Sequence, residues 1–226
     1  MALYTLRLST DRLEPKAEIR LGRCNRVVYV RDGDAIVRAG AHAAGLAANS
    51  AWHGGDAVAL TAGAAGATLL RWELAAGSTA PGGSTGAGVN SSTTLAHAVE
   101  LGHPDGHLMR CDRVDFPPGG IAYTHVHRGP GIRCLLAGNI RVEVNGKAHD
   151  IAPGGAWFEA GPDPVLALAS KAGPTAFVRV MILPRELLGK SSIRYVKPED
   201  TEKPKLQTYR IFVDEIIELR HQEIPD

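Results

Sequence analysis

The sequence predicts an all-β protein made of two consecutive small barrels, and three observations support this prediction. The chain of 226 residues contains 26 glycines and 14 prolines, a composition typical of short strands joined by many turns. Apolar, β-branched runs are separated by turn residues, as at Asp32-Gly33, where an Asp-Gly pair between two such runs predicts a hairpin. The order of the runs in the first half recurs in the second half after roughly a hundred residues, which indicates duplication of one barrel.

The charge balance argues against a nucleic-acid or membrane partner. Lysine and arginine number 25 and the acidic residues 24, so the net charge is +1 and produces no field that attracts polyanions or anionic lipids. No apolar run reaches the roughly 18 residues of a membrane helix, and no signal peptide is apparent. The three cysteines form no Cys-x-x-Cys pair, which is typical of reduced thiols. We therefore expect a soluble, cytoplasmic protein.

The N-terminal barrel is predicted to span residues 1–76. Two strands are expected in 26–37 and two more in 56–74, each pair around a glycine-containing break. The next stretch, 77–100, begins with a glycine- and serine-rich segment that has almost no large apolar side chains. Such a segment buries too little surface to hold one conformation, so 77–100 is predicted to be a linker.

The C-terminal barrel is predicted to span residues 101–188, where short apolar runs alternate with Gly, Pro and Asn turns. The tail, 189–226, is polar but contains the β-branched run 209–219, which is long enough for one more strand. We expect this strand to pack on the first barrel or on a partner subunit.

The segment 119–138 carries the most informative motif, a His-x-His pair between two glycines. Gly119, His125, His127 and Gly138 have the spacing of the first conserved motif of the cupin family, which this segment resembles. Gly131 stands where that motif has a glutamate. The resemblance implies two cupin-type double-stranded β-helix (jelly-roll) barrels, of which the first is degenerate because it lacks the His-x-His pair.

The second cupin motif is matched only in part. Gly154 and Gly161 fall in place, but neither the proline nor the histidine of that motif is present. Two of the four metal ligands that the resemblance would imply are therefore missing from this sequence.

A metal site can still be predicted from the two histidines. Residues two apart in a strand point to the same face, so His125 and His127 would present two imidazoles to the barrel interior, about 7 Å apart along the backbone. Glu159 is our candidate third ligand, because two imidazoles and one carboxylate form the triad of mononuclear iron oxygenases. The ion would be Fe, Mn, Ni or Zn. The alternatives are a hydrogen-bonded histidine pair without metal, and a Glu159 that is an exposed rim residue or a partner of Arg133.

Three residues are candidates for substrate binding. Arg133 shares the strand face of Gly131, so an inward guanidinium there would need either a protein carboxylate or an acidic substrate. Tyr123 lies on the face of the histidines and could orient a ligand through its hydroxyl, and Trp157 would line the same cavity. The alternatives are an ion pair for Arg133 and core packing for the two aromatic residues.

The function that these predictions favour is a metal-dependent cupin enzyme, a dioxygenase (an oxidoreductase) of a small carboxylated or diketone-like substrate. No catalytic residue is assigned. One alternative is a metal-free or non-catalytic small-molecule-binding protein, and another is a cupin isomerase or lyase that uses a histidine as a general base. Because members of the cupin family pair their barrels through exposed strands, the resemblance also implies a homodimer.

Overall fold

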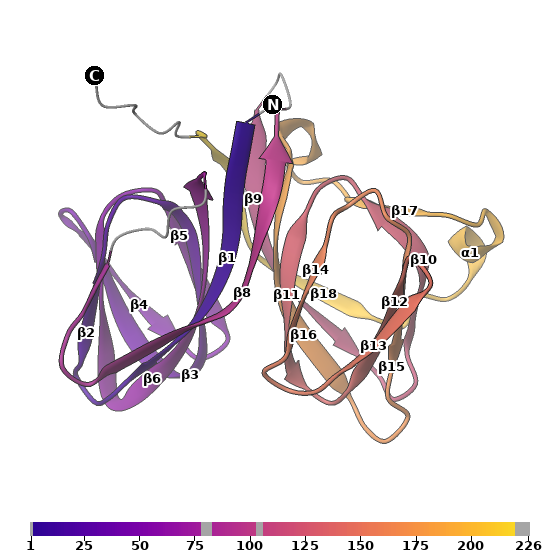
Figure 1. The fold of residues 1–226 in the computed structure, drawn as a ribbon. Coiled ribbons are helices and arrows are strands. Elements are labelled where there is room, and N and C mark those ends of the chain that lie inside the picture. The colour runs from indigo at the N-terminus through magenta and orange to yellow at the C-terminus, as the bar shows by residue number, and fades with distance from the viewer. Residues whose placement is uncertain (1, 78–82, 103–105, 220–226) are drawn as a thin grey trace. The chain divides into compact units, whose positions relative to one another are not determined.

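The computed structural model describes residues 2–77, 83–102 and 106–219, and these residues form two units built almost wholly of β-strands (Figure 1). The first unit contains the described residues up to 102 together with 217–219, and the second contains 106–216. Helical structure within the described residues is confined to the 3₁₀ turn Arg185–Leu187 and to α1, Glu199–Glu202. The predicted all-β class with two barrels is confirmed.

The first unit is one antiparallel sheet with the strand order β4-β3-β6-β1-β8, to which β2, β5 and β7 add. Its core packs leucine, isoleucine and valine side chains from β1, β2, β3 and β6 against one another. The strands are β1 (Ala2–Leu13), β2 (Glu18–Leu21), β3 (Asn25–Ala39), β4 (His42–Ala47), β5 (Ser50–Gly54), β6 (Val58–Ala76), β7 (Gly83–Thr85) and β8 (Val89–Leu101).

The predicted hairpin at Asp32-Gly33 is wrong, because β3 continues through these residues as one long strand. Gly33 has a φ of 76° and lies where the register of β3 against β6 shifts, so it forms a β-bulge. A Cβ at Gly33 would lie 2.1 Å from the carbonyl oxygen of Gly66, which itself has a φ of 80°. The two glycines therefore allow the backbones of β3 and β6 to approach closely at the position where the sequence predicted a turn.

The predicted linker 77–100 is also corrected by the structure. Its second half belongs to β8, which pairs with β1 from Ala2↔Leu101 to Leu13↔Val89. Most side chains of β8 are exposed or half-buried, since it lies at the end of the strand order. An edge strand gains its stability from backbone hydrogen bonds to one neighbour, so it tolerates serine and threonine in place of large apolar residues. The predicted glycine-rich part, 78–82, lies outside the described residues.

The second unit is a sandwich of two five-stranded antiparallel sheets, in the orders β13-β12-β15-β10-β17 and β14-β11-β16-β9-β18. The strands are β9 (His107–Phe116), β10 (Ile121–His127), β11 (Gly131–Ala137), β12 (Ile140–Val144), β13 (Lys147–Ile151), β14 (Ala156–Glu159), β15 (Val165–Ala169), β16 (Thr175–Pro184), β17 (Ile193–Tyr195) and β18 (Thr208–Ile217). One core cluster joins apolar side chains of both sheets, among them Phe116, Val142 and Phe177. This interior is where the sequence predicted a site.

The tail strand β18 pairs with β9 within the second unit, whereas the prediction placed it on the first barrel or on a partner subunit. Arg110 of β9 forms an ion pair with Asp214 of β18, with its Nε 2.8 Å from Oδ1 and its Nη2 3.0 Å from Oδ2. The guanidinium also donates to the carbonyl oxygens of Leu187 and Lys190. This buried, bidentate contact explains the choice of partner strand, which the β-branched pattern alone could not specify.

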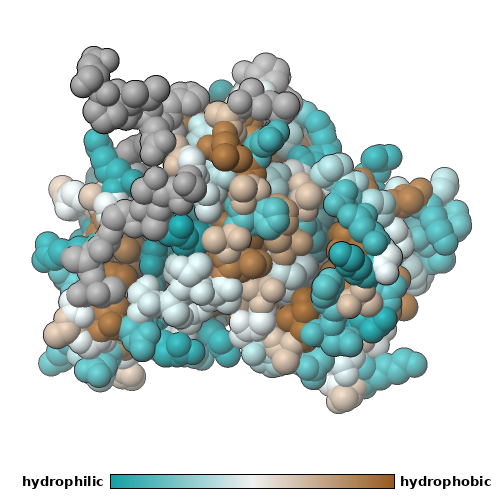
Figure 2. All heavy atoms as spheres, in the orientation of Figure 1, coloured by the Kyte–Doolittle hydropathy of each residue, from teal (hydrophilic) through white to brown (hydrophobic). Residues whose placement is uncertain are grey.

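The exposed surface mixes polar and apolar residues. On the face drawn in Figure 2, hydrophilic residues are interspersed with hydrophobic ones over the second unit. No helix within the described residues has the length and apolarity needed to cross a bilayer. The three cysteines are free thiols and buried.

Candidate metal and substrate site

His125 and His127 project from β10 into the second barrel. Their relative exposures are 5% and 3%, and their Nε2 atoms lie 3.2 Å apart. The prediction that alternate positions of one strand turn both imidazoles inward is confirmed. β10 is held between β15 and β17, so the strand that carries both rings is paired on both sides.

The hydrogen bonds of the two imidazoles show where their protons lie. Nδ1 of His125 is 2.7 Å from the carbonyl oxygen of Tyr123, which can only accept, so this nitrogen carries the proton and Nε2 carries a lone pair. Nε2 of His127 is 3.3 Å from Nη1 of Arg179, which can only donate, so its Nδ1 donates to Oγ of Ser192 at 3.3 Å. Two nitrogen lone pairs therefore face each other.

Glu159 completes the group. It lies opposite Gly131 where β14 pairs with β11, and it is only 7% exposed. Its Oε1 accepts a hydrogen bond of 2.8 Å from Nε1 of Trp157, while its Oε2 lies 2.6 Å from Nη2 of Arg133 and 3.6 Å from Nε2 of His127. The contact with Arg133 lacks the alignment of a hydrogen bond, so Oε2 is a buried oxygen without a hydrogen-bond partner.

These atoms fit the requirements of one divalent ion. The ligand atoms of His125, His127 and Glu159 all lie within 4.8 Å of one another. Two ligands at right angles on an ion with bonds of 2.0–2.1 Å would be about 3 Å apart, close to the observed separation of the imidazole nitrogens. A buried oxygen without a hydrogen-bond partner beside two lone pairs is the donor set that a cation would satisfy.

Two guanidinium groups border the same space and set its electrostatics. Burial, followed by the nearby Arg179 and Arg133, holds the pKa of His127 well below its usual value. Burial also lowers the pKa of His125, although Glu159 opposes this. Burial lowers the pKa of Arg133 to about 10, so it remains a cation at neutral pH. Both imidazoles are therefore neutral, the state in which histidine binds a metal.

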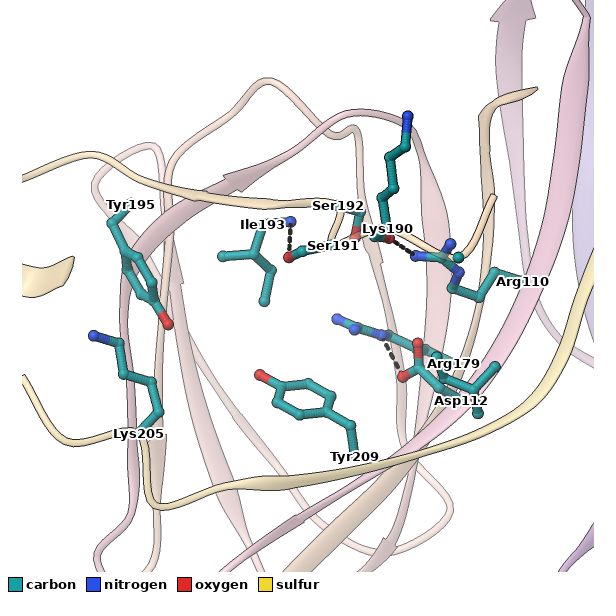
Figure 3. Close-up of a pocket in the computed structure, with 12 residues that line it drawn as sticks. Arg110, Asp112, Arg179, Lys190, Ser191, Ser192, Ile193, Tyr195, Lys205 and Tyr209 are labelled. Atoms are coloured by element: carbon teal, nitrogen blue, oxygen red, sulfur yellow. Dashed lines mark hydrogen bonds and ion pairs between the residues drawn. The ribbon is translucent and has the colours of Figure 1, made fainter. Parts of the chain in front are cut away.

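A cavity of about 350 Å³ lies beside this group in the second unit (Figure 3). Arg179 and Ser192 belong to its lining, and both also contact His127. The opposite part of the lining comes from the tail, through Tyr195, Lys205 and Tyr209. Figure 3 shows the hydroxyls of both tyrosines and the Arg179 guanidinium directed toward the same space. His125, His127 and Glu159 do not themselves line this cavity; Arg179 and Ser192 lie between it and His127.

The predicted substrate-binding residues have other positions than expected. Arg133 is completely buried and forms an ion pair with Glu159. This pair is the alternative to substrate binding by Arg133 and to a metal-ligand role for Glu159 that the sequence also allowed. Trp157 holds the other oxygen of Glu159. The ring of Tyr123 lies 4.8 Å from Nζ of Lys203 and outside the lining of the cavity, because β10 has an irregularity between Ala122 and His125 that breaks the simple alternation. Their roles toward a substrate stay predictions.

Arg179, Asp112 and the tail residues Tyr195, Lys205 and Tyr209 were not predicted from the sequence. Arg179 and Asp112 face each other across β16 and β9 and form an ion pair of 2.7 Å. A signal existed for Arg179, the one charged residue of the otherwise apolar β16. Asp112 did not stand out, because β9 also contains Arg110, Arg113 and Asp115. Tyr195, Lys205 and Tyr209 gave no such signal, because nothing in a polar tail indicates which of its side chains return to the barrel.

The first unit has ion pairs where the second has its site. In β3, Val28 pairs with Trp52 and Arg71, just as Arg133 in β11 pairs with Trp157 and Arg179. The repeat therefore equates Arg71 with Arg179. Two carboxylates neutralise Arg71 and its neighbour Arg26. Oδ2 of Asp11 lies 2.7 Å from Nε of Arg71, and Oε1 of Glu73 lies 2.9 Å from Nη2 of Arg26. No histidine takes part in these contacts.

Comparison with known proteins places the fold. No protein-family model and no curated protein matches the sequence. Among solved structures, AerE from Microcystis aeruginosa is similar with a TM-score of 0.58 and 13% identity over 79% of this chain and 88% of AerE. Oxalate decarboxylase from Bacillus subtilis at pH 4.6 is similar with a TM-score of 0.66 and 11% identity over 89% of this chain and 79% of the enzyme. At this identity the likeness shows the fold, which is the predicted cupin fold with two barrels.

Proposed function

We propose that the second barrel binds one divalent metal ion through His125, His127 and Glu159 and acts as an enzyme on a small carboxylate. The observation that carries this proposal is the convergence of two imidazole lone pairs, 3.2 Å apart, on a buried carboxylate oxygen that has no hydrogen-bond partner. Oε2 of Glu159 has an ion-pair contact with Arg133 at 2.6 Å but no aligned hydrogen bond, and an ion between the two Nε2 atoms would relieve the repulsion of their lone pairs.

The surrounding residues prepare this donor set. The carbonyl oxygen of Tyr123 and the hydroxyl of Ser192 fix the protons on the outer nitrogens, so both Nε2 atoms carry lone pairs. That of His127 also accepts from Arg179, a contact that a bound ion would replace. Trp157 orients Glu159 through Oε1 and leaves Oε2 directed at the histidines. A bound ion would polarise the oxygen atoms of a substrate as a Lewis acid.

The reaction class that we favour is dioxygenation. Two histidines and one carboxylate form the facial triad of non-haem iron oxygenases, which leaves positions free for substrate and O₂. Manganese is a further candidate, since a structure of the Bacillus subtilis oxalate decarboxylase with a TM-score of 0.64 was studied for its Mn(II) centres. Oxygen consumption during turnover distinguishes a dioxygenase from an isomerase or lyase that uses a neutral histidine as its base.

Metal analysis tests the site. Protein purified without chelator should contain about one divalent ion per chain, and the variants His125→Ala and Glu159→Gln should lose it. His149→Ala is the matched control, because His149 is an exposed histidine of β13 in the same unit. Equal metal content in the wild type and in both site variants would exclude this assignment.

Metal-free ligand binding is the second candidate, and a specific contact favours it. Nη1 of Arg179 donates to Nε2 of His127, which is one of the atoms that would bind the ion. Arg133 likewise occupies one side of Glu159. A barrel without metal would use these cations to hold an anion, and then organic acids, but no divalent ion, would raise its melting temperature.

A further inference from the structure

The cavity of the second unit carries more positive than negative charge. The cationic side chains of its lining are those of Arg110, Arg179 and Lys205, against one carboxylate, that of Asp112; Lys190 belongs to the lining but directs its ammonium group away from the cavity (Figure 3). Asp214 neutralises Arg110 from outside the lining, and Asp112 pairs with Arg179. The two lysines form no ion pair within the part of the chain that the structure describes. A pocket with this balance selects an anion.

Arg179 is the cation closest to the proposed metal donors. It is 5% exposed, donates its Nε to Asp112 at 2.7 Å and its Nη1 to Nε2 of His127 at 3.3 Å. Its Nη2 makes no hydrogen bond to any described residue, and Figure 3 shows the guanidinium pointing into the cavity. A guanidinium is a cation at neutral pH, so Arg179 carries its charge into the cavity. Arg179 thus offers an unused donor next to the histidines.

The tail supplies further donors on the opposite side. Tyr209 accepts a hydrogen bond of 3.1 Å from Nε2 of Gln207, so its own hydroxyl proton is available for a ligand. The hydroxyl of Tyr195, which is a donor as well as an acceptor, is directed into the same space (Figure 3). Nζ of Lys205 donates to the carbonyl oxygen of Asp200 at 2.6 Å and lies 4.6 Å from the centre of the Tyr195 ring, so its charge is held at the cavity.

We infer that Arg179, and not Arg133, anchors the carboxylate of the substrate, with the hydroxyls of Tyr195 and Tyr209 and the charge of Lys205 completing the anion subsite. This inference rests on the proposed function for the identity of the neighbouring metal site. Since Nη1 of Arg179 contacts a metal donor directly, an oxygen on the carbon next to an anchored carboxylate would lie toward the metal group. The substrate class is therefore a small 2-oxo or 2-hydroxy carboxylate.

Arg133 cannot serve as this anchor in the observed arrangement. Its exposure is 0%, its Nη1 donates to the carbonyl oxygen of Gly131 at 2.7 Å, and its Nη2 faces Glu159. It also lies outside the lining of the cavity. A substrate would have to break a buried ion pair to reach it, whereas Nη2 of Arg179 requires no such exchange.

Binding of small acids to chelator-treated and metal-loaded protein tests the inference. The probes are oxalate, glyoxylate, pyruvate, 2-oxobutyrate, lactate and propionate, each measured by calorimetry and by thermal shift. Pyruvamide and methyl pyruvate are the uncharged controls. We expect the acids to bind to chelator-treated protein and their neutral counterparts to bind at least about tenfold more weakly.

The key variant is the double substitution Arg179→Gln with Asp112→Asn, which removes the cation without leaving a buried carboxylate unpaired. It should fold and lose at least about tenfold in acid affinity. Tyr209→Phe, which keeps the ring, should weaken binding less. Lys190→Gln is the matched control, since Figure 3 shows that side chain directed away from the cavity, and it should bind like the wild type. If none of the acids binds, or if the folded double variant binds them unchanged, the inference is wrong.

The two proposals fail separately in this experiment. If the metal site is real, loading the protein with Mn²⁺ or Fe²⁺ should strengthen the binding of pyruvate over that of propionate, which lacks the oxygen on its second carbon. Equal strengthening, or none, contradicts the metal function while the dependence on Arg179 still supports the anchor. Loss of that dependence in protein that binds metal contradicts the anchor alone.

Discussion

Arg133 and Glu159 form a buried ion pair at 2.6 Å directly beside the two inward histidines, so the same carboxylate belongs to an ion pair and to the candidate metal site. Oε2 is shared between the two roles, and Oε1 is held by Trp157. The stability of the barrel and its affinity for metal are therefore coupled through one side chain.

Removing only the carboxylate charge should destabilise the protein strongly. Glu159→Gln leaves Arg133 as a buried cation without a counter-charge, and we expect a loss of about 3–5 kcal/mol in the free energy of unfolding. The double variant Arg133→Met with Glu159→Gln removes both charges and should recover most of this loss while binding no metal. Urea denaturation of chelator-treated protein measures both effects. A double variant as unstable as the single one would contradict the coupling.

The stability of the metal-free protein should decrease below about pH 6.5. The pKa of His125 and that of His127 are lowered by burial in the folded protein, so the unfolded chain binds protons in this range that the folded protein does not. The stability that each buried, neutral histidine adds is fully present above the pKa of histidine in the unfolded chain. It is lost as the pH falls below that value, by up to about 1.4 kcal/mol per pH unit for each imidazole. Denaturation at a series of pH values checks this. His127→Gln should flatten the dependence, and His149→Gln, at an exposed position, should not.

Restoring a side chain at position 131 should fail to restore the family's glutamate ligand. A Cβ there would lie 2.6 Å from the carbonyl oxygen of Val180 and 2.8 Å from Cγ of Met181. Backbone atoms cannot yield cheaply, so Gly131→Ala should cost about 1–3 kcal/mol and Gly131→Glu no less. Gly173→Ala is the control, since a Cβ there meets nothing within 4 Å. An increase in metal affinity in Gly131→Glu would show that the site can accept the missing ligand.

Disrupting the ion pairs of the first unit should affect stability and leave the metal content unchanged. Arg71→Met removes the cation that lies between the buried carboxylates of Asp11 and Glu73. The free energy of unfolding should decrease by about 3–5 kcal/mol. Arg20→Met, whose side chain is 75% exposed, should change stability by less than about 1 kcal/mol. Loss of metal in a folded Arg71→Met protein would mean that the first unit also contributes to binding.

The sequence predicted the donors of the site because they obey a local rule. His125 and His127 are two residues apart on one strand, and a strand fixes the direction of alternate side chains whatever its partners are. Glu159 was chosen because it ends the strand where the turn of the second motif begins, and because a carboxylate would complete a triad with the two imidazoles. Arg133 was correctly placed on the interior side, and its alternative as an ion-pair partner is confirmed.

The elements that could not be predicted depend on contacts distant in sequence. The strand β8 looks like a linker by composition, because an edge strand is defined by its neighbour β1 and not by its own apolar residues. Gly33 looks like a turn, since only the approach of Gly66 shows that it is a bulge. Tyr195 reaches the cavity because β17 pairs with β10, and Tyr209 because β18 pairs with β9, and a polar tail reveals neither choice.

The tail residues that line the cavity have a consequence for how this protein can diversify. The two histidines lie on β10, which is paired on both sides, and Glu159 lies on β14 at the end of its sheet, whereas Lys205 lies between α1 and β18 in a stretch without strand pairing. The charge of the cavity can thus be altered at Lys205 without changing a strand, whereas β17 is not freely exchangeable, because it pairs with the strand that carries both histidines.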